Sequence, residues 1–107
     1  MRAMIGTSLR VTAQVRVLFL QLQVPLDEIW TVLYIQASDP NNAVVQAEIF
    51  VNQIPKVSIA LEMHHQVAVV NRKIQGGSIL SMYGTPAGPV NSTFAYMALI
   101  DRVKTGA

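Results

Sequence analysis

Apolar and polar residues alternate along most of this chain, from about Leu9 to Val103. The stretch 45–51 is typical, because its odd-numbered residues are aliphatic and its even-numbered residues are glutamine, glutamate and phenylalanine. Successive side chains of a β-strand point to opposite faces, so this period of two predicts strands with one packed face and one outward face. We therefore expect an all-β fold.

Clusters of proline, glycine and asparagine divide the alternating stretches into seven or eight short strands. In a chain of 107 residues this spacing is typical of a single-domain β-sandwich with jelly-roll or Greek-key strand order. We expect residues 1–8 to form an N-terminal arm, residues 9–103 the sandwich domain and residues 104–107 a C-terminal tail.

Two local features of the pattern lead to more detailed predictions. Strand signal runs from about residue 9 to residue 24, but its phase slips near Leu18 and Phe19, which predicts a bulge or a crossing between sheets there. The Asp-Pro-Asn-Asn segment at residues 39–42 is a strong turn signal, so residues 29–37 and 43–52 are expected to pair as a hairpin.

The composition argues against several classes of partner. Charged residues make up 13% of the chain and the net charge is +2, which is too little for the electrostatic grip that nucleic-acid binding needs. No apolar run approaches the roughly 18 residues of a membrane helix, so we expect no membrane partner. The chain has no cysteine, which excludes disulfides and thiolate metal sites.

One local group of residues could hold a metal ion: Glu62, His64 and His65. Adjacent residues of a strand point to opposite faces, so both histidines reach one ion only if the chain turns there. Glu62 and His64 share a face, and a small metal-dependent jelly-roll enzyme would need a third ligand beside them. Two histidines in total, no nucleophile elbow and no nucleotide-binding fingerprint favour a protein that is not an enzyme and has no cofactor.

Two of the expected strands are apolar on both faces, over residues 29–35 and 94–100. A two-sheet sandwich of this size has one interior, so part of this surface is expected to meet another chain. Trp30, Val32 and Tyr34 fall on one face of their strand, where they fit the core, a subunit contact or a stacking platform for sugars.

Four blocks of this pattern bear a resemblance to a known group of proteins: residues 27–34 (DEIWTVLY), 45–51 (VQAEIFV), 76–80 (GGSIL) and 92–103 (STFAYMALIDRV). In them the chain resembles the decoration or cement proteins of tailed-bacteriophage heads, which are small β-sandwich or jelly-roll proteins. The resemblance implies a structural role on the outer capsid surface of a virion assembled in the host cytoplasm. Its implied partners are the major capsid protein, whose lattice it would stabilise, and further copies of itself as a homodimer or homotrimer.

On this hypothesis the arm and one strand face supply the contacts with other proteins. The residues expected to make them are Arg2, Met4, Ile5, Leu9, Trp30, Val32, Tyr34 and Met97. The alternative is a carbohydrate- or receptor-binding module of a phage fibre or tail, which would use Trp30 or the loop at residues 83–89.

Overall fold

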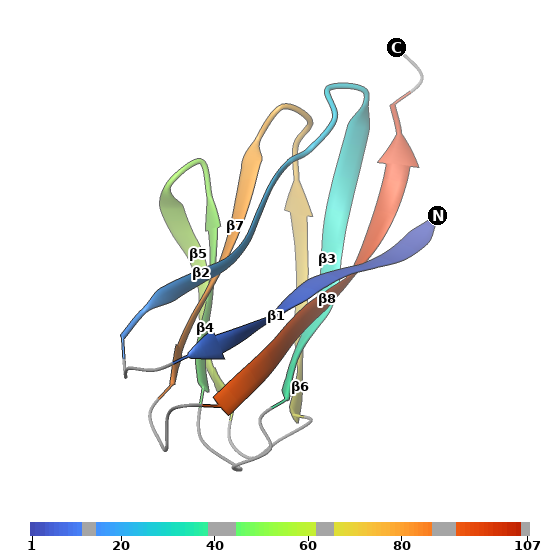
Figure 1. Cartoon of the computed structure of the whole chain (residues 1–107). Helices are drawn as coiled ribbons and strands as arrows, with labels where there is room; N and C mark the ends of the chain where they lie inside the picture. The colour runs from blue at the N-terminus through green and yellow to red at the C-terminus, as the bar shows by residue number, and fades with distance from the viewer. Residues whose placement is uncertain (12–14, 39–44, 62–65, 87–91, 106–107) are drawn as a thin grey trace.

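The computed structural model describes residues 1–11, 15–38, 45–61, 66–86 and 92–105, and its regular structure there is entirely β-strand (Figure 1). The strands are β1 (Arg2–Val11), β2 (Val17–Gln23), β3 (Glu28–Ser38), β4 (Val45–Val51), β5 (Ile54–Leu61), β6 (Gln66–Ile74), β7 (Ile79–Pro86) and β8 (Ser92–Lys104). The all-β prediction and the expected number of strands are confirmed.

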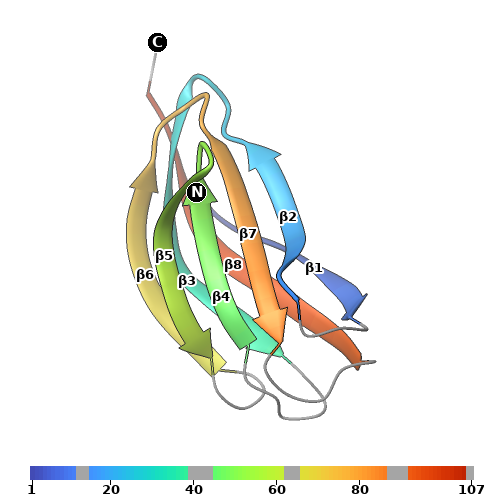
Figure 2. The ribbon, with the colours of Figure 1, turned by 90° about the vertical axis from the view of Figure 1, so that its left-hand side faces the viewer.

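The strands form two antiparallel four-stranded sheets, which we call sheet A (β1-β8-β3-β6) and sheet B (β2-β7-β4-β5). Figure 2 shows sheet B in front of β3, β8 and β1 of sheet A. Strands of the first half pair with strands of the second half: β1 with β8, β2 with β7, β3 with β6 and β4 with β5. One long hairpin rolled into a sandwich has this order, which is that of a jelly roll.

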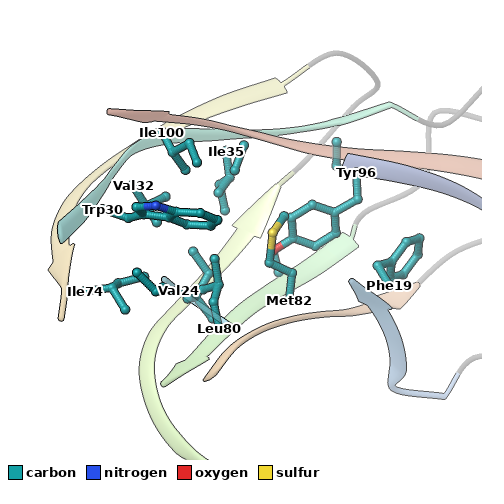
Figure 3. Packing of buried hydrophobic residues seen from close by; sticks show 14 of the residues in the cluster. Phe19, Val24, Trp30, Val32, Ile35, Ile74, Leu80, Met82, Tyr96 and Ile100 are labelled. Carbon is teal, nitrogen blue, oxygen red and sulfur yellow. The ribbon is translucent and has the colours of Figure 1, made fainter. Parts of the chain in front are cut away.

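The core lies between the two sheets and is built from the inward-facing side chains of both (Figure 3). Ile35 of β3 and Tyr96 of β8 project from sheet A, and Phe19 of β2 and Met82 of β7 project from sheet B. The ring centroids of Phe19 and Tyr96 lie 5.4 Å apart across this layer. Because this interior is filled from both sides, the outer faces and the edges of the sheets are the surfaces left for other molecules.

The alternating stretch 9–24, for which a bulge or a crossing between sheets is predicted, contributes to two strands in different sheets. β1 ends in sheet A and β2 begins in sheet B. The predicted phase slip is confirmed, because the register of β2 against β7 shifts between Leu18 and Leu20. Phe19 is the extra residue of this bulge, and the bend sends its ring into the core.

The expected hairpin between residues 29–37 and 43–52 is wrong, because its two strands lie in different sheets. β3 pairs with β6 and β8, whereas β4 pairs with β5 and β7. A turn signal shows that the chain reverses, but it does not show which strand is the partner. The tight hairpin is β4–β5, where Asn52 and Gln53 have φ values of 52° and 69°. Positive φ at both central residues characterises a type I′ turn, whose twist matches that of the flanking strands.

Residues 2–8, expected to form an arm, belong to β1, which is an edge strand of sheet A. The register of β1 against β8 runs without a shift along all ten residues of the strand. The side chains of Ala3, Ile5 and Leu9 pack against the core, and this packing holds the segment to the sandwich. The C-terminal strand in turn extends to Lys104, one residue into the expected tail.

A bulge at Leu33 exchanges the two faces of β3 partway along the strand. The register against both neighbouring strands shifts between Val32 and Tyr34. Trp30 and Val32 before the bulge and Ile35 after it point into the core, whereas Tyr34 lies on the outer face. The prediction that Trp30, Val32 and Tyr34 share a face is therefore wrong. This segment is apolar at almost every position, so its alternation could not reveal the slip.

Candidate interaction surface

The outer face of sheet A carries apolar side chains from all four strands. Directly opposite residues of an antiparallel ladder share a face, so the register defines these lines of side chains. The first line, which we call the apolar row, consists of Met4, Leu99, Tyr34 and Val69. The second row consists of Gly6, Met97, Gln36 and Val67.

The ends of these two rows are open to solvent. Met4 is 50% exposed, Val67 48% and Val69 72%, while Tyr34 and Met97 are half-buried among their neighbours. Single exposed apolar residues are ordinary, but contiguous apolar surface on a soluble protein marks a place where another molecule binds. The two rows are therefore the candidate interaction surface.

A line of charged and polar side chains borders the apolar row on the side away from the second row. Its members, in strand order across the sheet, are Arg2, Asp101, Thr31 and Lys73. An apolar centre beside a polar rim is the usual anatomy of a protein–protein interface.

A shallow hollow of about 320 Å³ lies over Gly6 at the β1 side of the surface. Residues 4–8 of β1 line it together with Ala95 and Met97 of β8. A Cβ atom at Gly6 would lie 2.6 Å from Met97 Cγ and 2.6 Å from the Tyr96 carbonyl oxygen, so this position requires glycine. The missing side chain allows the close approach of β8 and leaves the hollow open above it.

The outer face of sheet B differs, because its side chains contact one another. Gln21 Nε2 donates a hydrogen bond to Ser81 Oγ at 3.1 Å, and Gln46 Nε2 donates to Ser58 Oγ at 2.7 Å. These cross-strand pairs use polar groups that would otherwise be free to bind a partner.

An aromatic pair on the same face is covered by an arginine. The rings of Phe50 and Tyr83 pack edge to face with centroids 5.0 Å apart. The Arg16 guanidinium lies 4.8 Å from the Tyr83 centroid and 5.4 Å from that of Phe50, which is within cation–π range. The outward aromatic residues of sheet B are thus already partnered within the chain.

One ion pair joins β3 to β8 at the end of sheet A. Arg102 donates from Nε to Glu28 Oε1 at 2.8 Å and from Nη2 to Oε2 at 3.0 Å, and Trp30 Nε1 donates to Oε1 at 2.9 Å. These hydrogen bonds, first from Arg102 and then from Trp30, lower the pKa of Glu28 to about 2. A carboxylate held ionised with both oxygens occupied is suited to fastening two strands and not to transferring protons.

The structure brings half of the predicted contact residues together on the outer face of sheet A. Those on this face are Arg2, Met4, Tyr34 and Met97. Those that point into the sandwich are Ile5, Leu9, Trp30 and Val32. Trp30 is 6% exposed and Val32 1%, because they lie on the inward side of the bulge at Leu33. These four predicted contact residues are core residues or pack against the core.

Two major members of the surface, Leu99 and Val69, were not among the predicted contact residues. Leu99 lies two residues from the predicted Met97 on the same strand face, and this spacing is the signal that could have identified it. Val69 had no comparable signal, because its place beside Tyr34 depends on the pairing of β3 with β6, strands that are distant in the sequence.

The structure bears on the alternative sites to different degrees. Trp30 is buried against Glu28, so its ring is not available as a platform for sugars. Residues 83–86 of the expected binding loop belong to β7, and residues 87–89 lie outside the described residues. Glu62, His64 and His65 also lie outside them; within the described ranges, no three metal-ligating side chains gather.

Comparison with protein-family models gives no match, and comparison with curated proteins gives none either. In the part of the chain that the structure describes, no helix is long and apolar enough to span a membrane. The function of the chain is therefore inferred from the surface itself.

Proposed function

We propose that this chain is a capsid decoration, or cement, protein that docks on the outer surface of a viral head and stabilises the major capsid lattice. The observation that carries the proposal is the apolar row, which crosses the outer face of sheet A from Met4 to Val69. A jelly roll is compatible with many functions, so this surface, and not the fold, supports the proposal.

The form of the surface suits docking on another folded protein. The apolar row and the second row together form a broad, shallow surface across four strands, whereas small-molecule sites are concave and enclose their ligand. The adjoining row carries both signs of charge, with Arg2 and Lys73 at its ends and Asp101 between them. Such a rim can orient the protein on a lattice of identical subunits, where many copies, each bound weakly, together reinforce the shell.

A receptor- or glycan-binding module is the second candidate, and it rests on the Phe50–Tyr83 pair of sheet B. Sugars stack on open aromatic faces, but here Arg16 already lies over both rings. This candidate therefore ranks below the cement function. Specific binding on a glycan array that is lost in Tyr83→Ala would reverse the ranking.

The test of the proposed function is the number of copies of this chain in each virion, measured by quantitative mass spectrometry of particles purified from its source. A cement protein is expected at a copy number comparable to that of the major capsid protein. A handful of copies would instead indicate a tail or fibre component, and complete absence would refute the structural role.

A further inference from the structure

The sandwich has four edge strands, and three of them carry features that discourage pairing with another chain. β5 contains Pro55 and Lys56 and has a register shift against β4. β6 is irregular at Asn71, whose φ is 51°, and β2 is bulged at Phe19. Proline, charge and bulges are the usual protections of an exposed sheet edge. β1 has none of these in its interior, and charge occurs only near its ends, at Arg2 and Arg10.

The hydrogen bonds between β1 and β8 show which backbone groups of β1 face the open edge. Met1 N donates to Arg102 O at 2.7 Å and Arg102 N donates to Met1 O at 2.8 Å, so these two residues form a hydrogen-bonded pair. Such pairs alternate along an antiparallel ladder, and the register of β1 has no shift. The odd-numbered residues of β1 therefore bond to β8. The even-numbered residues, 2 to 10, direct their N–H and C=O groups to the open edge, where no described residue accepts or donates a backbone bond to them.

We propose that β1 pairs with β1 of a second copy of this chain, antiparallel about a twofold axis at Ile5. In this register residue i lies opposite residue 10 − i of the partner, so Met4 faces Gly6 and Arg2 faces Ser8. All four hydrogen-bonded pairs then use even-numbered residues, and they supply roughly eight backbone bonds. The two copies of sheet A become one continuous eight-stranded sheet.

The shape of the outer face favours this register, because β1 carries a projection and a hollow two residues apart. The exposed Met4 side chain and the hollow over Gly6 lie on the same face of the strand. An axis at Ile5 places Met4 of each copy directly beside Gly6 of the other. Methionine is flexible enough to fill an irregular hollow, and the symmetry makes this contact twice.

The charges of β1 argue against an axis at Gly6, and the hollow argues against an axis at Thr7. An axis at Gly6 would place Arg2 opposite Arg10, and like charges directly across a ladder repel. An axis at Thr7 would place Ser8 beside Gly6, and serine is too small to fill the hollow. The axis at Ile5 avoids both problems.

This pairing adds to the proposed function without resting on it. It joins the apolar row of each copy to the second row of the other, since Met4 begins one row and Gly6 begins the other. A dimer that fails to bind heads, or a monomer that binds them, would separate the two proposals.

Cysteine cross-linking tests the register directly, because the natural chain contains no cysteine. Ile5 and its symmetry mate form a non-hydrogen-bonded pair with Cα atoms about 4.5 Å apart, which a disulfide can span. We expect oxidised Ile5→Cys to become a covalent dimer on a non-reducing gel. Thr7→Cys, which is off the axis, and Ser58→Cys, on the outer face of sheet B, are expected to form no covalent dimer. Cross-linking of Thr7→Cys in place of Ile5→Cys, or equal cross-linking of all three, would overturn the proposal.

A second measurement does not depend on the packing of Ile5. Proline at position 8 removes an N–H that faces the open edge and leaves the bonds to β8 intact, whereas Ser8→Ala keeps that N–H. Analytical ultracentrifugation should show a dimer for the natural chain and for Ser8→Ala. For Ser8→Pro the dissociation constant of the dimer should be roughly tenfold or more higher. The pairing would be refuted by a natural chain that stays monomeric at 100 times the concentration used in the cross-linking experiment, or by a Ser8→Pro dimer of unchanged affinity.

Discussion

The outer faces of the two sheets share one fold and one alternating pattern, yet they use their exposed side chains differently. On sheet B the outward residues pair among themselves, as Gln46 does with Ser58 at 2.7 Å and Arg16 with the Phe50 and Tyr83 rings. On sheet A the outward residues form the apolar row, and no side-chain hydrogen bond joins its members to other described residues. The alternation along a strand predicts which side chains are exposed. The chemistry of their cross-strand neighbours decides whether those side chains are left free for a partner.

The sheets also differ in how their strands are fastened. An ionised pair, Glu28 with Arg102, joins β3 to β8 in sheet A, whereas neutral amide–hydroxyl bonds link the described outer positions of sheet B. Sheet A therefore depends on a group that acid can neutralise, and this difference leads to the largest expected effect on stability.

Glu28→Gln should cause the largest loss in the free energy of unfolding, and the loss should depend on pH. The pKa of Glu28 is lowered from 4.5 to about 2 in the folded chain, so its stabilising effect is complete above about pH 4.5. That effect should be lost as the pH falls from 4.5 toward 2. Chemical denaturation should show that the natural and variant chains differ in their free energy of unfolding by a constant amount above about pH 4.5. This difference should shrink as the pH falls below that value.

The matched control for this prediction is Gln46→Ala, which removes a neutral bond from sheet B. Its free energy of unfolding should lie below that of the natural chain by the same amount at every pH. A Glu28→Gln gap that stays constant down to pH 2 would show that the ion pair does not fasten sheet A.

Tyr96→Phe should stabilise the protein by about 1 kcal/mol, because it removes a buried hydroxyl for which the described residues provide no partner. Tyr96 lies on the inward face of sheet A, and its hydroxyl makes no hydrogen bond with the described residues. Burial also raises its pKa. Thermal unfolding provides the measurement, with Tyr83→Phe on sheet B as the control, expected to be nearly neutral. A clear loss of stability in Tyr96→Phe would mean that the hydroxyl is satisfied after all.

Arg16→Ala should cost about 0.5–1 kcal/mol of stability through the lost cation–π contacts and leave docking unchanged. Denaturant unfolding and binding to heads, measured on the same preparation, separate the two effects. Weakened docking without loss of stability would place sheet B, and not sheet A, at the interface.

The sequence predicted most of what depends on short-range pattern. The alternation gave the fold class, and the phase slip located the bulge at Phe19, because a one-residue insertion exchanges the faces of a strand. The β3–β4 hairpin was wrong, because pairing in a jelly roll joins strands that are far apart in the chain. The β4–β5 turn was missed, since Asn52 and Gln53 adopt positive φ without the glycine that usually marks such a turn.

The candidate surface was only partly accessible to sequence reasoning for the same physical reason. Tyr34 and Met97 were identified from strands that are apolar on both faces. Trp30 and Val32 were misplaced, because the bulge at Leu33 is hidden in a segment with almost no polar residue to mark the phase. The contribution of Val69 depends on a neighbouring strand, which sequence periodicity does not identify.

The outer face of sheet A, and not that of sheet B, is the surface that we propose binds the viral head. The most direct test is a co-sedimentation assay with purified heads that compares Val69→Lys in the apolar row with Ser58→Lys on sheet B. Both positions are exposed, so both variants should fold, although Ser58→Lys also removes the acceptor of the exposed hydrogen bond from Gln46. We expect Val69→Lys to weaken binding roughly tenfold or more and Ser58→Lys to bind like the natural chain. Unchanged binding by Val69→Lys, or a loss confined to Ser58→Lys, would contradict the assignment of the binding surface to sheet A.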